Sequence, residues 1–278
     1  MLPNSDLDLI FIYEHEAETE GSEGGQRSLA PSEYFIRLSH QVVAALTTPG
    51  RDGRAFEVDM RLRPSGNKGP VAVRLSAFAR YHAEEAWTWE RMALTRARVI
   101  AGPTPLTRRI EAALDTALAT PRDPLAVLRD AAQMRARMLR ELPGDGPWDL
   151  KAMAGGLVEV EFIAQALTVA HAASHPRLLR RTTRHVLGEL GRAGLIEERE
   201  AATLIQAERL WRALLGRLRL TVGKWKEPGL PVTVEEALRQ GAGTLVHEEI
   251  QSLDHLREVM GCHAEAVRAS FLRHVGPL

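Results

Sequence analysis

Alternation of apolar and polar positions predicts a short strand near the start of the chain. Residues 5–13 read SDLDLIFIY. Because successive side chains of a strand point to opposite faces, Asp6 and Asp8 share one face, and Leu7 and Leu9 point the other way into a core. The apolar run of residues 9–13 predicts a buried strand with its carboxylates at the mouth of the fold.

A second segment repeats this pattern. Residues 56–66 read FEVDMRLRPSG and predict a strand over that range. Its apolar positions, Val58, Met60 and Leu62, define one face. The opposite face carries Glu57, Asp59, Arg61 and Arg63. If the two strands are neighbours, three carboxylates converge: Asp6, Asp8 and Asp59.

Apolar positions spaced three and four apart predict helices through most of the remaining sequence. The polar, Gly- and Ser-rich residues 14–31 predict a surface loop, after which Ser32 is the expected cap of a helix. A short strand is expected at residues 71–74. From Ser76 a helix rich in aromatic residues follows, with Phe78, Tyr81, Trp87 and Trp89. Further helices are expected from residue 124, capped by Asp123, and at residues 157–172, 178–191, 196–222, 233–239 and 248–275.

Prolines divide the chain into a mixed part and a helical part. Pro103, Pro105 and the PRDP stretch of residues 121–124 interrupt the periodic pattern. We therefore expect two domains, residues 1–104 and residues 122–278. The first contains strands and helices, and the second is an all-α bundle, so the fold class is α+β.

Within the predicted bundle, residues 148–165 combine a glycine pair with acidic residues. Gly155 and Gly156 indicate a tight entry into a helix, because neither a preceding strand nor a Lys-Ser/Thr pair accompanies them. Glu161 shares a helix face with Leu157, so we expect it to be partly buried and paired with Lys151 or an arginine.

Composition restricts the classes of function. The chain has 278 residues, 36 basic and 36 acidic, and thus a formal net charge of zero, which argues against nucleic acid as a partner. Its one cysteine excludes internal disulfides and favours the cytoplasm. The sequence contains no run of about eighteen apolar residues, so we expect no membrane span.

The acidic face suits a hard cation. Mg²⁺ prefers a few carboxylate oxygens and completes its shell with water and phosphate oxygens. An Asp-x-Asp pair is also common on exposed strand edges, so the pair alone is weak evidence. Arg61 and Arg63 can bind a triphosphate with forked donors, or can pair with neighbouring carboxylates. The residues leave both interpretations open.

Four motifs, in order, resemble the glutamine synthetase adenylyltransferase family, a branch of the polymerase β-like nucleotidyltransferases. They read SDLDLIFIY, VDMRLRPSGNKGP, EEAWTWERMALTRARVIAG and WDLKAMAGGLVEVEFIAQ. Members of this family carry two nucleotidyltransferase units. The motifs RLRPSG and EEAWTWE are similar to those of the C-terminal unit, which attaches AMP to a tyrosine of glutamine synthetase. The resemblance implies a polymerase β-like nucleotidyltransferase domain followed by a helical bundle.

The resemblance also implies the roles of particular residues. Asp6, Asp8 and Asp59 match the family's metal ligands, and Asp59 also matches the group that helps to deprotonate the attacking hydroxyl. Ser5, Arg61 and Arg63 are the expected nucleotide-binding residues. The expected cofactor is Mg²⁺, the co-substrate is ATP, and the protein partners are glutamine synthetase and a PII-type regulator.

One departure from the family pattern leads to a second interpretation. The family places a Gly-Gly or Gly-Ser turn about a dozen residues before its Asp-x-Asp motif, where backbone N–H groups cradle phosphates. Five residues precede Asp6 here, so we expect a domain incomplete at its N-terminus. The alternative function is an inactive fragment that binds glutamine synthetase, a PII-type regulator or a partner chain.

Overall fold

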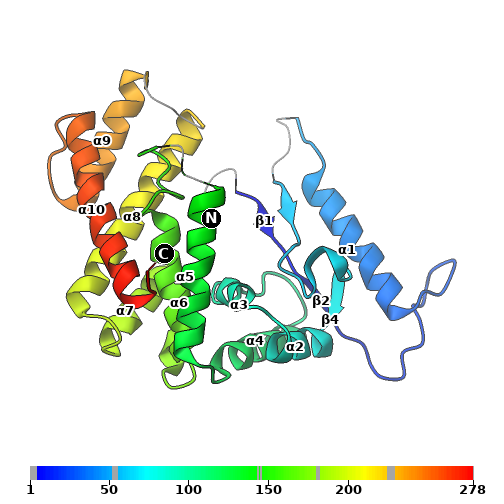
Figure 1. Ribbon diagram of the computed structural model, residues 1–278. Coiled ribbons are helices and arrows are strands. Elements are labelled where there is room, and N and C mark those ends of the chain that lie inside the picture. The colour runs from blue at the N-terminus through cyan, green and yellow to red at the C-terminus, as the bar shows by residue number, and fades with distance from the viewer. Residues whose placement is uncertain are drawn as a thin grey trace. The chain divides into compact units, whose positions relative to one another are not determined.

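The computed structural model describes residues 5–51, 56–142, 144, 146–179, 182–223 and 229–277 (Figure 1). The chain forms two compact units. The first contains the described residues up to Glu90 together with Val99–Ala117, and the second contains Arg91–Arg98 and the described residues from Leu118 onward. The proline-rich stretch between the two expected domains contains a helix, α4 (Thr104–Ala119).

The first unit is built on two pairs of short parallel strands. Its elements are β1 (Leu7–Asp8), β2 (Phe11–Tyr13), α1 (Pro31–Thr47), β3 (Val58–Asp59), β4 (Ala72–Arg74), α2 (Leu75–Glu84), the start of α3 (Thr88–Leu94) and most of α4. Strand β1 pairs with β3, and β2 pairs with β4. Helix α1 packs against β3 and β4, and α2 packs against β2 and β4 (Figure 1).

The continuous strand expected over residues 5–13 is split into β1 and β2, which pair with different strands. The run at residues 9–13 is half-buried, so the predicted strand is less buried than expected. The strand expected over residues 56–66 was also too long, since β3 ends at Asp59. The Arg63 N–H bonds to the carbonyl of Met60 at 3.3 Å, which turns the chain.

Two helix predictions need correction. Ser32 is not the cap of α1, because Ala30 takes that position and Pro31 opens the helix, where its missing N–H costs nothing. The aromatic helix is two helices, α2 and α3, separated by residues 85–87. Phe78 is buried in the core, but Trp87 lies in the break with 70% of its surface exposed.

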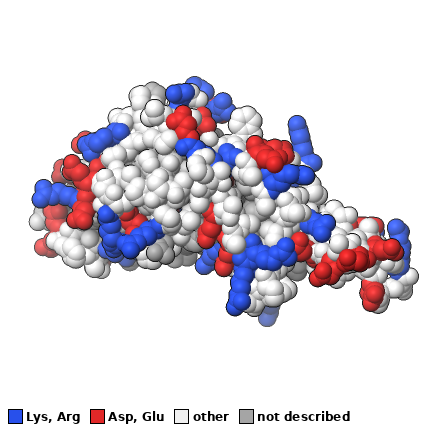
Figure 2. Space-filling model, turned by 90° about the horizontal axis from the view of Figure 1, so that it is seen from below, with Lys and Arg blue, Asp and Glu red and all other residues white. Residues whose placement is uncertain are grey.

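Acidic side chains gather on the loop between β2 and α1. Residues 14–30 form no helix or strand, as predicted, and include Glu14, Glu16, Glu18, Glu20 and Glu23. Red side chains gather at the right-hand end of Figure 2, the end to which this loop extends in Figure 1. Glu14 pairs with Arg109 of α4 at 2.5 Å, which ties the start of the loop to the same unit.

The second unit is a helical bundle, as expected. Its helices are the end of α3, α5 (Pro124–Glu141), α6 (Leu157–His171), α7 (Thr183–Arg192), α8 (Glu198–Thr221), α9 (Val232–Val246) and α10 (Leu253–His274). Asp123 caps α5 by accepting the Leu125 N–H at 3.0 Å, which confirms the cap and the first-turn proline. Helix α6 is almost entirely buried and packs against α5, α7, α8 and α10. Among the described residues, no helix is long and apolar enough to cross a membrane.

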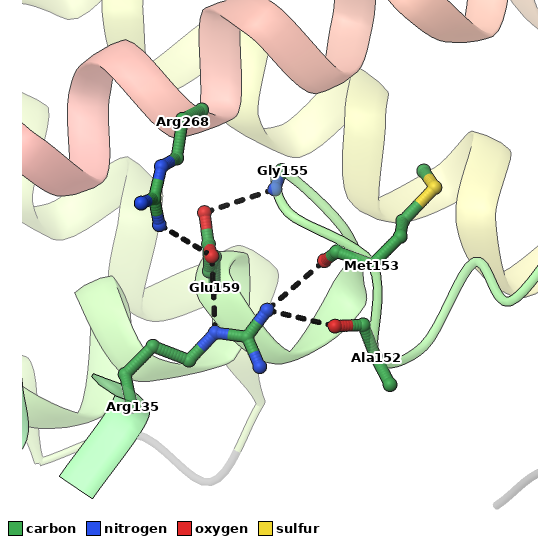
Figure 3. A network of polar contacts seen from close by, with 6 residues as sticks. All are labelled: Arg135, Ala152, Met153, Gly155, Glu159 and Arg268. Carbon is green, nitrogen blue, oxygen red and sulfur yellow. Dashed lines mark hydrogen bonds and ion pairs between the residues drawn. The ribbon is translucent and has the colours of Figure 1, made fainter. Parts of the chain in front are cut away.

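A buried carboxylate links four parts of this bundle (Figure 3). Glu159 of α6 is fully buried, and its Oε1 accepts from Arg135 Nε at 3.0 Å and from Arg268 Nη1 at 2.9 Å. Its Oε2 accepts the Gly155 N–H at 2.9 Å. Arg135, 1% exposed, also donates to the carbonyls of the loop before α6, those of Ala152 and Met153. The network therefore joins α5, α6, α10 and this loop.

The glycine pair opens α6 as predicted. Gly155 has a φ of +74°, and a Cβ there would lie 2.0 Å from the carbonyl oxygen of Ala264 in α10. Only glycine permits this backbone conformation together with so close an approach. The expected pairing of Glu161 with an arginine is confirmed, since Arg96 and Arg212 each lie 2.8 Å from its carboxylate.

Candidate active site

Two of the predicted metal ligands face each other across a strand pair. In the parallel pairing of β1 with β3, Leu7 lies opposite Val58 and Asp8 lies opposite Asp59. The Leu7 and Leu9 N–H groups donate to the carbonyls of Glu57 and Asp59, both at 2.8 Å. Partners at the same register of neighbouring strands are about 5 Å apart and share a face of the sheet. The structure therefore brings Asp8 and Asp59 together.

Arg61 occupies the space next to these carboxylates. Its Nε lies 2.7 Å from Asp59 Oδ2, and its backbone N–H donates to Oδ1 at 2.8 Å. The Arg61 guanidinium holds the pKa of Asp59 below its ordinary value of 3.8. In turn Asp59, and at longer range Asp8 and Asp6, raise the pKa of Arg61. All three carboxylates therefore act on one guanidinium.

The other predicted site residues occupy different surroundings. Asp6 is exposed and lies two residues before Asp8, while Ser5 is half-buried. Arg63 is 7% exposed, and its guanidinium donates to the carbonyls of Met60 at 2.6 Å and Gly69 at 3.3 Å. Arg63 thus holds the loop after β3 in shape. The left-handed conformation of Ser65, with a φ of 60°, lies in the same loop.

The residues present fit a hard cation in chemistry, although not as a closed cage. Opposed carboxylates on a partly exposed strand pair leave positions for water and phosphate oxygens, as Mg²⁺ sites require. In the described part of the chain, no group of three or more His, Cys, Asp and Glu side chains gathers closely enough to hold a metal ion. The three-carboxylate site therefore stays a prediction. At Asp59 the positive charge is supplied by Arg61.

A buried glutamate that sequence reasoning did not single out lies at the start of α3. Glu90 is 4% exposed and accepts from the Tyr81 hydroxyl at 2.9 Å and from the Trp87 N–H at 2.8 Å. Burial and the Glu90 carboxylate raise the pKa of Tyr81. The only sequence signal was the density of aromatic and acidic residues in EEAWTWE. This contact fixes the backbone of Trp87 and leaves its indole exposed.

Removing the Arg61 side chain is expected to raise the pKa of Asp59 toward its ordinary value. Its hydrogen bonds are the largest cause of the lowered value. In the native protein this pair stabilises the fold above the ordinary pKa and is lost as pH falls through the lowered one. Carboxyl ¹³C NMR titration of Arg61→Ala checks this. Arg37→Ala, which removes an exposed partner of Glu33, is the control and leaves Asp59 unchanged. An equally low pKa in Arg61→Ala would contradict the assignment.

Comparison with known proteins identifies the relatives of both units. The family model described as glutamate-ammonia ligase adenylyltransferase matches residues 2–113, a range that includes every predicted site residue. The model described as GlnD PII-uridylyltransferase matches residues 131–273 in the helical bundle.

Curated bifunctional glutamine synthetase adenylyltransferase/adenylyl-removing enzymes match most of the chain. The enzyme of Xanthobacter autotrophicus is 42% identical over 245 residues, which is 88% of this chain and 25% of that protein. Those of a Bradyrhizobium strain and of Rhodopseudomonas palustris are 43% and 44% identical over 228 residues, 82% of this chain and 23% of each relative. The chain spans about a quarter of the length of these relatives. It belongs to the glutamine synthetase adenylyltransferase family.

Proposed function

We propose that the chain transfers AMP from ATP to a tyrosine hydroxyl of glutamine synthetase and so regulates nitrogen assimilation. The observation that carries this proposal is the register of β1 and β3, which sets Asp8 opposite Asp59 within the region matched by the adenylyltransferase model. The names of the relatives supply the reaction and the protein substrate.

We propose that Asp6, Asp8 and Asp59 hold Mg²⁺. The ion supplies charge neutralisation for the phosphates of ATP and for the oxygens that attack and leave. The chain's contribution is to position these carboxylates on adjacent strands. Ser5 and Arg61 border this face and are the proposed contacts to the triphosphate. Arg63 is a further proposed contact, although in this structure its guanidinium donates to the carbonyls of Met60 and Gly69.

The Arg61–Asp59 pair suggests how proton transfer is controlled. A tyrosine hydroxyl has an ordinary pKa near 10, so its proton must be accepted by a base. Asp59 is a weak base while Arg61 lowers its pKa. The Arg61 side chain is 72% exposed and therefore has room to turn toward a bound triphosphate. That movement would release Asp59 and restore its basicity when the nucleotide is in place.

Family membership also suggests the fold of the first unit, a regulator and a cellular location. We propose a polymerase β-like fold for the first unit, a PII-type protein as regulator and a cytoplasmic location. The match of the bundle to a PII-uridylyltransferase model supports a link to PII, and the short parallel strands under α1 and α2 are compatible with the fold.

AMP incorporation tests the proposed function. Purified chain, Mg²⁺ and ATP are expected to add one AMP to each modified tyrosine of glutamine synthetase, read by mass spectrometry of its peptides. EDTA is expected to stop the reaction, and glutamine synthetase with its target tyrosine changed to phenylalanine is the matched control. Failure of the chain to modify glutamine synthetase, combined with tight binding to it, would favour a binding module instead.

A further inference from the structure

An open groove of about 350 Å³ lies on the helical unit where α8 meets α7 and α9. It is lined by Arg184, Glu208, Arg209, Arg212, Ala213 and Leu245. Three of these six side chains are guanidinium groups and one is a carboxylate. The groove belongs entirely to the second unit, whereas the carboxylates of β1 and β3 belong to the first.

Glu208 in this groove has an oxygen whose hydrogen bonding is incomplete. The residue is 2% exposed. Arg212 Nε donates to its Oε1. Arg184 Nε lies 3.2 Å from its Oε2 as an ion pair, but the geometry leaves Oε2 without a hydrogen bond among the described residues. A buried carboxylate oxygen in this state is expected to accept a donor from a bound molecule.

The rim of the groove offers cationic donors. Arg209 is exposed and forms no hydrogen bond or ion pair with any described residue. The Arg184 side chain is half exposed, and the Arg212 guanidinium forms ion pairs with Glu208 and Glu161. Since each guanidinium has five N–H groups, donors remain for an anion. The lining therefore carries a net positive charge around one carboxylate oxygen that has an ion-pair partner but no hydrogen bond among the described residues.

We propose that this groove binds a phosphate group in its protonated form, either free phosphate or a phosphate monoester. The guanidinium forks of Arg184, Arg209 and Arg212 match phosphate oxygens. The P–OH of a protonated phosphate donates to Glu208 Oε2. Sulfate has the same size and shape but carries no proton near neutral pH, so it would place an oxygen against the Glu208 carboxylate. The groove is thus selective for phosphate over sulfate.

Calorimetric titration of the full chain tests this selectivity. The probes are inorganic phosphate, glycerol 3-phosphate and sulfate, at a pH of about 6, near the second pKa of a phosphate monoester. Phosphate is expected to bind about tenfold or more tightly than sulfate, because a charge-assisted hydrogen bond replaces a repulsion. Tighter binding of glycerol 3-phosphate assigns the groove to a monoester, and tighter binding of inorganic phosphate assigns it to the free ion.

Variants locate the binding. Arg209→Ala is expected to weaken phosphate binding about tenfold, while Arg199→Ala, an exposed arginine of the same helix outside the groove, leaves it unchanged. Glu208→Gln is expected to remove the preference for phosphate over sulfate. Glu208 also supports the fold, so Glu208→Gln could be unstable. In that case the comparison of Arg209→Ala with Arg199→Ala decides the question. Equal affinity for the two anions, no binding of phosphate, or unchanged binding in Arg209→Ala would overturn the proposal. The AMP-transfer assay is independent of all three results.

Discussion

Replacing Glu159 by alanine is expected to lower the free energy of unfolding of the helical unit by about 3–5 kcal/mol. The side chain is fully buried and satisfies Arg135, Arg268 and the Gly155 N–H. Without it, Arg135 keeps its positive charge at 1% exposure with only two backbone carbonyls as acceptors. Most of the loss comes from this uncompensated charge rather than from the net strength of the pair.

Urea unfolding followed by tryptophan fluorescence measures this loss, because Trp211 is fully buried in α8 and reports on the same unit. Glu141→Ala is the matched control. Glu141 is exposed and pairs weakly with Arg137 at 4.0 Å, so its removal is expected to cost less than about 0.5 kcal/mol. A loss below about 1 kcal/mol in Glu159→Ala would show that the bundle tolerates an unpaired Arg135.

Replacing Asp8 by asparagine is expected to lower AMP incorporation by about two to three orders of magnitude. Asparagine keeps the size of the side chain but removes the negative charge opposite Asp59, and loss of one charged group at a transferring phosphoryl centre has effects of about this size. Asp6→Asn is expected to behave in the same way. Asp6 and Asp8 are exposed, so both variants are expected to fold, as circular dichroism can verify.

Glu57→Gln is the matched control for these variants. Glu57 is an exposed carboxylate two residues before Asp59, and Asp59 rather than Glu57 is the proposed metal ligand. Its replacement is expected to leave AMP incorporation unchanged. Comparable losses in Glu57→Gln and Asp8→Asn would mean that general negative charge, rather than a defined pair of ligands, supports the reaction.

The sequence predicted the features that depend on local patterns. Strand alternation identified the polar faces of β1 and β3 and the residues that the register sets opposite each other, Asp8 and Asp59. The spacing of apolar positions and the Asp123–Pro124 cap predicted the helices of the second unit. Alternation, apolar spacing and helix caps each involve residues close together in the chain, so they can be recognised in a single sequence.

Other features depend on contacts that no local pattern contains. Strand β3 stops at Asp59 because Arg63 turns back to the carbonyls of Met60 and Gly69, although its alternating pattern continues. The sequence drew attention to Glu161, which is only partly buried, while the neighbouring Glu159 is fully buried. Its arginine partners lie 24 and 109 residues away, and their choice depends on how α5 and α10 pack.

The 109-residue separation between Glu159 and Arg268 has a consequence for the order of events during synthesis. While the ribosome extends the chain, helices α5 to α9 can assemble before α10 emerges, but the Glu159 carboxylate then lacks one of its two guanidinium partners. Contacts between distant segments form late because closing a long loop costs entropy before any contact forms. Docking of α10 is therefore the event that supplies Glu159 with its second guanidinium partner, and chains that lose α10 to early termination are expected to be substrates for cellular proteases.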